Sequence, residues 1–233
     1  MEGLSRRLQQ AIACLPDCEV IADIGCDHGY AALALVQTGK AKRVIACDIS
    51  APSLEKTRRL FNQHHRQEQV ELFVCDGLAR AEQAQAALIA GMGGHTITRI
   101  LQKDAPIAHN LERLVLQPSD GVNVLRCFLA HNGYALQEET IVRDGRLYPI
   151  LCVRYTGRPY ALTPAQAYIG PFNLMRMDAE TSAYIRWQMN ILQKTYQTPA
   201  TSERGRCMQR QNRHLAEQLA QLLPKEKRES VKR

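Results

Sequence analysis

Acidic residues recur where three successive apolar runs end, and their chemistry suggests a ligand. Asp23 lies in the run Val20–Ile24, and Asp48 and Asp76 close the next two runs. A carboxylate attracts a cation and accepts hydrogen bonds from hydroxyl or amine groups. If the runs are parallel strands, their carboxyl ends meet at one sheet edge and form one cleft. We therefore predict a binding site there, although each aspartate taken alone is equally consistent with a helix cap.

The segment from Asp23 to Gly29 has the pattern Asp-x-Gly-x-Asp-x-Gly. A dinucleotide site requires Gly-x-Gly-x-x-Gly, and its absence disfavours a nicotinamide dehydrogenase. The segment resembles the Asp/Glu-x-Gly-x-Gly-x-Gly loop of S-adenosylmethionine enzymes, with Asp27 in place of the middle glycine. The methionine end of that cofactor carries an ammonium and a sulfonium, which carboxylates suit, whereas carboxylates repel phosphate. The alternative is an ordinary strand–helix turn with a capping aspartate.

Glycines follow the fourth apolar run, Ala86–Ala90. Gly91, Gly93 and Gly94 allow the backbone to approach a ligand closely and leave amides facing it, with a flexible loop as the alternative. Enzymes that methylate exocyclic amines of bases carry Asn/Asp-Pro-Pro-Tyr at this point, and no such motif is present. The loop therefore favours binding over base-assisted chemistry at this strand end.

These loops need a sheet to hold them at one edge. Five apolar runs alternate with helical stretches, which is the pattern of βαβ units. The runs are Val20–Ile24, Arg43–Cys47, Val70–Cys75, Ala86–Ala90 and Arg113–Leu116, and the helical stretches lie near 30–38, 52–66, 95–104 and 121–132. Residues 134–143 and 146–155 are β-rich and joined by Asp144-Gly145, a hairpin signal. We predict an α/β fold with a seven-stranded, mostly parallel sheet, as in class I (Rossmann-like) methyltransferases, preceded by an amphipathic helix at 4–15.

The net charge of +7 is confined to the last third of the chain. Residues 1–157 hold 17 Lys and Arg against 17 Asp and Glu, whereas residues 158–233 hold 13 against 6. Strand signals stop after Gly157-Arg158-Pro159, so we predict a methyltransferase domain over 1–157 and a basic helical-hairpin domain over 158–233. Candidate phosphate contacts, with a solvated charged face as the alternative, are Arg7, Arg186, Lys194, Arg204, Arg206, Arg210 and Arg213.

Helix signals in the second domain are local and specific. Thr163-Pro-Ala-Gln166 has the form of a capping box. Asp178 and Ser202 can begin two long helices, the first of which Pro199 ends. Apolar stripes on the two helices predict an antiparallel, coiled-coil-like pair, and they consist of Ile185, Met189, Leu192 and Tyr196, and of Met208, Leu215, Leu219 and Leu222.

The composition excludes several classes of protein. The 233 residues, 45% of them hydrophobic, are enough for a full core. No apolar run approaches the roughly 18 residues of a membrane span, and no signal-like stretch follows the N-terminus, so we expect a cytoplasmic protein. Most of the eight cysteines lie in apolar runs, which predicts reduced core thiols. Cys14-x3-Cys18 lacks a second ligand pair, and we expect no metal.

Taken together, these segments resemble the bacterial TrmK family over nearly the whole chain. The matching segments are Leu4-Ser5-x-Arg7-Leu8, Ala22-Asp23-Ile24-Gly25-x-Asp27-His28, Asp76-Gly77-Leu78, Ile89-Ala90-Gly91-Met92-Gly93-Gly94, Leu116-Gln117-Pro118 and Gly170-Pro171. Members of this family are S-adenosylmethionine-dependent methyltransferases of adenine N1 at position 22 in tRNA. The resemblance implies this activity, S-adenosylmethionine as cofactor and tRNA as partner.

The resemblance and the loops together define the expected site. The cofactor-binding residues are Asp23, Gly25, Cys26, Asp27, His28, Asp48, Ile49, Asp76, Gly77, Gly91, Met92 and Gly93. The candidate catalytic residues, which orient the base, relay a proton or read the adenine edge, are Asp27, His28, Tyr30 and Gln117. We expect a monomer. Two alternatives stay open: a methyltransferase of the same fold that acts on another RNA, a protein or a small molecule, and a non-catalytic RNA-binding module.

Overall fold

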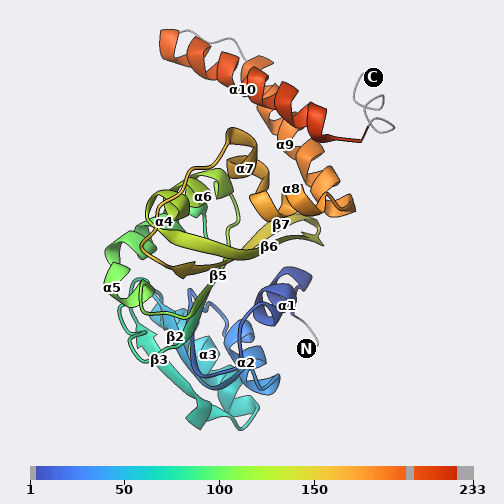
Figure 1. Ribbon diagram of the computed structural model, residues 1–233. Helices are drawn as coiled ribbons and strands as arrows, with labels where there is room; N and C mark the ends of the chain where they lie inside the picture. Colours follow the sequence, from blue (N-terminus) through green and yellow to red (C-terminus); the bar gives the residue numbers. More distant parts are fainter. Residues whose placement is uncertain (1–3, 198–201, 225–233) are drawn as a thin grey trace. The chain divides into compact units, whose positions relative to one another are not determined.

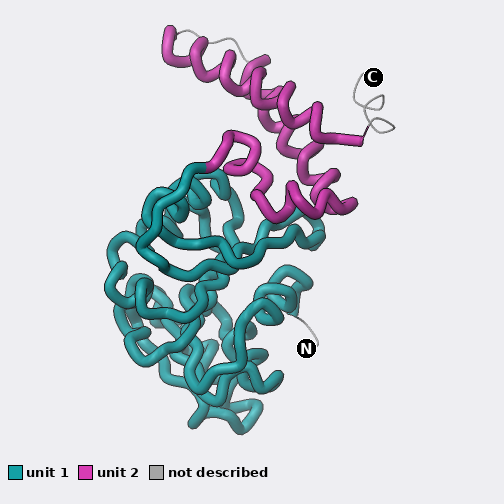
Figure 2. The backbone as a smooth tube through the Cα atoms, in the orientation of Figure 1, with its two compact units in different colours: residues 1–161 teal, residues 162–233 magenta. Residues whose placement is uncertain are grey.

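The structure, a computed structural model, describes residues 4–197 and 202–224, so the predicted helix end at Pro199 lies outside the described residues. The chain forms two compact units, residues 1–161 and 162–233 (Figure 2). Within the described ranges, no helix is both long and apolar enough to cross a membrane. All eight cysteines are free thiols, but only Cys14, Cys26, Cys47 and Cys152 are buried in the core.

One seven-stranded sheet forms the centre of unit 1 (Figure 1). Its strands are β1 (Cys18–Ile24), β2 (Ala41–Asp48), β3 (Val70–Val74), β4 (Ala86–Ala90), β5 (Arg113–Gln117), β6 (Tyr134–Asp144) and β7 (Arg146–Tyr155). The order is β3-β2-β1-β4-β5-β7-β6. The first five strands run parallel, whereas β7 is antiparallel to both β5 and β6. The predicted mostly parallel sheet with a terminal hairpin is confirmed.

Helices cover both faces of this sheet, and the central strands β1, β4 and β5 are buried on both sides (Figure 1). One apolar cluster joins the sheet to α1 (Arg6–Ala13), α2 (Tyr30–Gln37) and α3 (Ala51–Gln63). The cluster on the opposite face involves α4 (Gly94–Lys103), α5 (Ala105–Ala108) and α6 (Val122–His131). A short 3-10 helix, η1 (Gln67–Gln69), precedes β3. Burial on both faces explains why the parallel strands are continuous apolar runs rather than alternating ones.

Unit 2 is helical. It contains α7 (Pro164–Ile169), α8 (Pro171–Arg176), α9 (Ala179–Gln197) and α10 (Glu203–Leu222). Thr163 and Gln166 form the predicted capping box, with bonds of 3.3 and 2.9 Å. Asp178 and Ser202 accept from backbone amides three residues later, at 2.7 and 3.1 Å, so both predicted caps are present. The predicted helix starts are therefore correct.

The long helices α9 and α10 pack against each other. Ile185 and Leu192 on α9 and Leu215 and Leu219 on α10 are buried. Met208 is 56% exposed, so the predicted apolar stripe does not extend to the start of α10. Leu222 of the same predicted stripe is 40% exposed. The buried residues therefore lie mostly toward the start of α9 and the end of α10.

Candidate functional site

The carboxyl ends of the five parallel strands β1 to β5 surround a cleft of about 640 Å³. The strand order reverses between β1 and β4, which is the point at which open α/β sheets bind ligands. Ile24 of β1 pairs with Cys47 of β2 and with Ile89 of β4. Because of this register, the loops that follow the three strands begin at the same level and meet over the cleft.

Almost every residue predicted for the cofactor or for catalysis lines this cleft; Gly93 is the exception. The lining residues among them are Asp23, Gly25, Cys26, Asp27, His28, Tyr30, Asp48, Ile49, Asp76, Gly77, Gly91, Met92 and Gln117. Arg7 of α1 lines it as well, whereas the other predicted RNA contacts lie on α9 and α10 of unit 2. The structure thus brings together residues from five strand ends.

The loop between β1 and α2 turns through left-handed backbone. Gly25, Asp27 and Gly29 have φ angles of 75°, 46° and 76°. A Cβ at Gly29 would lie 2.4 Å from Cγ2 of Thr57, so a side chain at this position would collide with α3. A Cβ at Gly25 would lie 2.2 Å from Cε of Met92, whose side chain covers this glycine. Both glycines are favoured by φ, and Gly29 is also required by its close approach to buried Thr57, whereas the flexible Met92 side chain can move away from Gly25.

Asp23 supplies a buried oxygen that lacks a partner. Its side chain is 3% exposed, and Oδ2 accepts no hydrogen bond from the part of the chain that the structure describes. Burial raises the pKa of Asp23 to about 7, the backbone amide of Ala32 opposes the rise, and the Asp48 carboxylate adds to it. An unpaired buried acceptor costs free energy. A ligand that donates a hydrogen bond or carries a positive charge would remove that cost.

Asp48 connects two loops at the end of β2. Oδ2 accepts from the Asp27 amide at 3.0 Å, and Oδ1 accepts from the Ser50 amide at 2.8 Å. Each carboxylate oxygen retains capacity for a further donor. Ile49 beside it is 75% exposed and offers an apolar surface in the cleft wall. This combination suits a ligand with hydroxyl groups next to a flat apolar ring.

Asp76, after β3, is held by a cation. Its Oδ2 lies 2.9 Å from Nζ of Lys103, which also donates to the Asp76 carbonyl at 2.5 Å. The hydrogen bond from Lys103 lowers the pKa of Asp76. At Gly77 a Cβ would lie 2.5 Å from Oδ2 of Asp104, the oxygen that accepts from the Leu78 amide at 2.7 Å. The third acidic strand end is therefore charged and fixed to α4.

Gln117 corrects one expectation. It is fully buried; its Oε1 accepts from the Gly91 amide at 3.2 Å, and its Nε2 donates to the Pro118 carbonyl at 2.9 Å. The side chain holds the glycine loop in place and does not present its amide edge to a base. Gly93 also departs from expectation, because it packs toward Asp120, whose Oδ1 would lie 3.0 Å from a Cβ there. Both residues therefore support the conformation of the loop that follows β4.

His28 and Tyr30 lie together in the cleft wall. Their rings stack with centroids 6.0 Å apart, and Tyr30 is 56% exposed. Nε2 of His28 lies 3.6 Å from Oδ1 of Asp27 and 3.4 Å from Nζ of Lys56. This group combines an exposed aromatic surface with an imidazole between a carboxylate and an ammonium. It can stack on a base and exchange a proton.

Several lining residues were not predicted, among them the polar residues Thr96 and Arg99 of α4. Ile97, Ile100 and Leu101 of this helix are buried, so its polar residues must point away from the core. The spacing of Thr96, Arg99 and Lys103 by three and four residues would have indicated a polar stripe. That signal was available in the sequence.

Comparisons with known proteins show the family to which this fold belongs. The family described as Methyltransferase domain matches residues 4–151. The tRNA (adenine(22)-N(1))-methyltransferase of Bacillus subtilis is 33% identical over 176 residues, which cover 72% of this chain and 74% of that protein. The crystal structure of the B. subtilis m1A22 tRNA methyltransferase TrmK superposes with a TM-score of 0.84 at 27% identity, covering 96% of this chain and 100% of that one.

A further structure shares the fold. M. capricolum TrmK, in complex with S-adenosylhomocysteine, superposes with a TM-score of 0.79 at 21% identity, covering 95% of this chain and 99% of that chain. The likeness extends over both units, because the matches with these solved structures cover nearly the whole chain.

Proposed function

This chain belongs to the TrmK family of bacterial tRNA methyltransferases, and we propose that it methylates N1 of adenine 22 in tRNA with S-adenosylmethionine as the methyl donor. The observation that carries the proposal is the buried, unpartnered Oδ2 of Asp23 at the switch point of the sheet. Because tRNA is modified in the cytoplasm, we also propose a cytoplasmic location. The monomeric state stays a prediction.

The residues of the cleft fit S-adenosylmethionine. Asp23 would accept from the ammonium of its methionine end, which satisfies the orphaned oxygen. Asp48 would accept from the ribose hydroxyls, since its oxygens have capacity left beyond the two backbone amides. Ile49 would pack against the adenine ring, and Asp76 would lie near the adenine amine.

The remaining wall of the cleft sets the geometry of transfer. When bound, S-adenosylmethionine supplies an electrophilic methyl group on a sulfonium. Adenine N1 carries a lone pair, so the protein must align the base and exclude water rather than remove a proton first. Tyr30 and His28 provide the stacking surface, and Gln117 fixes Gly91 so that the loop after β4 bounds the space for the base. The methylated base is cationic, and the Asp27–His28 pair can take the amine proton that it later releases.

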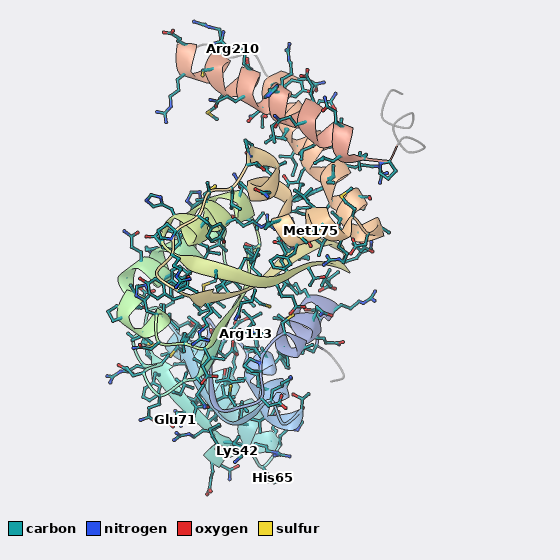
Figure 3. All side chains as sticks on the ribbon, in the orientation of Figure 1. Lys42, His65, Glu71, Arg113, Met175 and Arg210 are labelled. Atoms are coloured by element: carbon teal, nitrogen blue, oxygen red, sulfur yellow. The ribbon has the colours of Figure 1, made fainter. Side chains whose placement is uncertain are left out.

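The basic helices of unit 2 are proposed to hold the tRNA. Lys194, Arg204, Arg206, Arg210 and Arg213 are exposed, and Arg186 is half-buried. Positions 206, 210 and 213 lie on one face of α10, because residues three and four apart are neighbours on a helix. Arg210 is labelled in Figure 3. A row of guanidinium groups on one face can contact successive phosphates of a folded RNA.

The RNA contact is tested by replacing the arginines at positions 206, 210 and 213 with glutamine. Each lost phosphate contact lowers the slope of log affinity against log salt by about 1. We expect weaker tRNA binding, a slope reduced by about 3, and unchanged cofactor affinity. An unchanged slope would show that this face is only solvated.

The cofactor site is tested by calorimetric titration of S-adenosylmethionine into Asp23→Asn. Asparagine keeps the size of the side chain but removes the charge that pairs with the ammonium, so we expect the affinity to fall by at least about tenfold. Asp17→Asn is the matched control, because Asp17 pairs with Lys40 at 2.9 Å and lies outside the cleft. Near wild-type affinity in Asp23→Asn would refute the assignment of the cleft.

A further inference from the structure

Outside the cleft, a second group of reactive side chains gathers on the α1 side of the sheet. It consists of Cys14, directly after α1, Glu138 of β6 and Cys152 of β7. Their two sulfur atoms and one carboxylate oxygen all lie within 4.8 Å of one another. The three residues are far apart in the sequence and meet because α1 packs on β6 and β7.

A β-bulge brings Glu138 into this group. The register of the β6–β7 pair shifts between Leu136 and Glu138, so that Glu138 lies directly opposite Cys152. Residues that pair across two strands project on the same face of the sheet. Bulges re-aim side chains and often lie next to functional sites. The extra residue, Gln137, is held by a 3.2 Å bond from Nε of Arg113.

Two thiolates and one carboxylate are ligands that zinc binds in proteins. Zinc binds thiolates at about 2.3 Å and carboxylate oxygens at about 2.0–2.2 Å in a tetrahedron, which places neighbouring ligand atoms about 3.6–3.8 Å apart. The observed limit of 4.8 Å requires only a small closure of the three side chains. The fourth position can be filled by water, since Glu138 is exposed.

The surrounding charges match a divalent cation. Two thiolates and a carboxylate bring three negative charges, and a zinc ion together with the Arg113 guanidinium balances them. Arg113 donates from Nη1 to the Cys14 carbonyl at 3.0 Å, and it is labelled in Figure 3. Metal binding would displace the protons of both thiols.

We propose that Cys14, Glu138 and Cys152 form a zinc site. The site fixes the end of α1 to the β6–β7 edge, and α1 carries Arg7 and Leu8 into the wall of the cleft. The proposal is independent of the proposed function, because it rests on a different set of residues. Cys18, the other half of the Cys14-x3-Cys18 pair, is not part of the group.

The test uses the full chain with the exposed residues Cys127 and Cys207 replaced by serine, which removes surface thiols that bind metal adventitiously. The metal-free, reduced protein is titrated with Co²⁺ while thiolate-to-metal charge-transfer absorption is recorded, and zinc is then added as competitor. We expect one equivalent of Co²⁺, displacement by zinc, and a higher Tm with zinc. Loss of the absorption in Cys152→Ser and its persistence in Cys18→Ser would support the site.

A serine at buried Cys152 can impair folding, so Glu138→Gln provides a second arm at an exposed position. We expect this variant to fold and to lose both the stoichiometric binding and the increase of Tm with zinc. The proposal is overturned if no charge-transfer absorption forms, if it persists unchanged in Cys152→Ser and Glu138→Gln, or if the protein as isolated contains a Cys14–Cys152 disulfide and no metal.

Discussion

Replacing Asp23 by asparagine should make the cofactor-free protein more stable at alkaline pH. Burial raises the pKa of Asp23 from 3.8 to about 7. The native state therefore holds a proton over a pH range in which the unfolded chain has released it. The contribution of Asp23 to the free energy of unfolding is therefore fully present below about pH 4 and is lost as the pH rises to about 7. A shift of this size corresponds to about 4 kcal/mol.

The asparagine variant has no such loss. Its buried amide brings a cost of about 1–3 kcal/mol if the amide hydrogens lack partners, and this cost does not depend on pH. The free energy of unfolding of Asp23→Asn minus that of the wild type should therefore increase by about 3–4 kcal/mol between pH 4 and pH 8. The increase, rather than the value at one pH, isolates the ionisation of Asp23.

Urea unfolding at pH 4, 6 and 8, followed by far-ultraviolet circular dichroism, measures this difference. Tryptophan fluorescence is unsuitable because the single tryptophan, Trp187, lies in unit 2. The reasoning is refuted if the difference between the two proteins is the same at all three pH values. A constant difference would mean that Asp23 is ionised in the native state without cost, and the ligand would not be needed to satisfy its buried oxygen.

Three other substitutions test separate parts of the account. Arg99→Gln should weaken tRNA binding and reduce the slope of log affinity against log salt by about 1, with cofactor affinity unchanged, in binding measured at several salt concentrations. Weaker cofactor binding with unchanged tRNA binding would mean that Arg99 contacts the cofactor instead. Gly29→Ala should destabilise the protein by about 1–3 kcal/mol more than Gly39→Ala in urea unfolding. Both glycines have φ near 75°, but only a Cβ at Gly29 collides with Thr57, whereas a Cβ at Gly39 meets nothing within 4 Å. Equal losses would mean that the collision with Thr57 contributes nothing. Arg126→Met should cost about 3–5 kcal/mol, because it removes the buried cation that lies 3.1 Å from Oε2 of Glu139, itself 1% exposed. A loss under about 1 kcal/mol in urea unfolding would contradict this.

The features that the sequence predicted well are local or periodic. The helix caps at Asp178 and Ser202 depend on one side chain and a backbone amide three residues away, so they can be recognised without tertiary structure. The parallel strands were recognisable because burial on both faces leaves a continuous apolar run. The strand-end aspartates followed from the topology, since parallel strands place their carboxyl ends at one edge.

The features that the sequence did not predict depend on packing between distant segments. Nothing near Gln117 indicates that its amide is used by Gly91 and Pro118, and this is why we expected it to face a base. The bulge that places Glu138 opposite Cys152 shifts the register within a β-rich run, and no turn residue marks it. Tertiary contacts of this kind are set by the pairing of strands rather than by residue type.

The central claim is tested most directly by the product formed on tRNA. The full-length protein is incubated with S-adenosylmethionine and an unmodified tRNA transcript that carries adenine at position 22, and the digested nucleosides are identified by mass spectrometry. We expect 1-methyladenosine from this transcript and none from a transcript with guanine at position 22. Formation of N6-methyladenosine or a methylguanosine without 1-methyladenosine would contradict it.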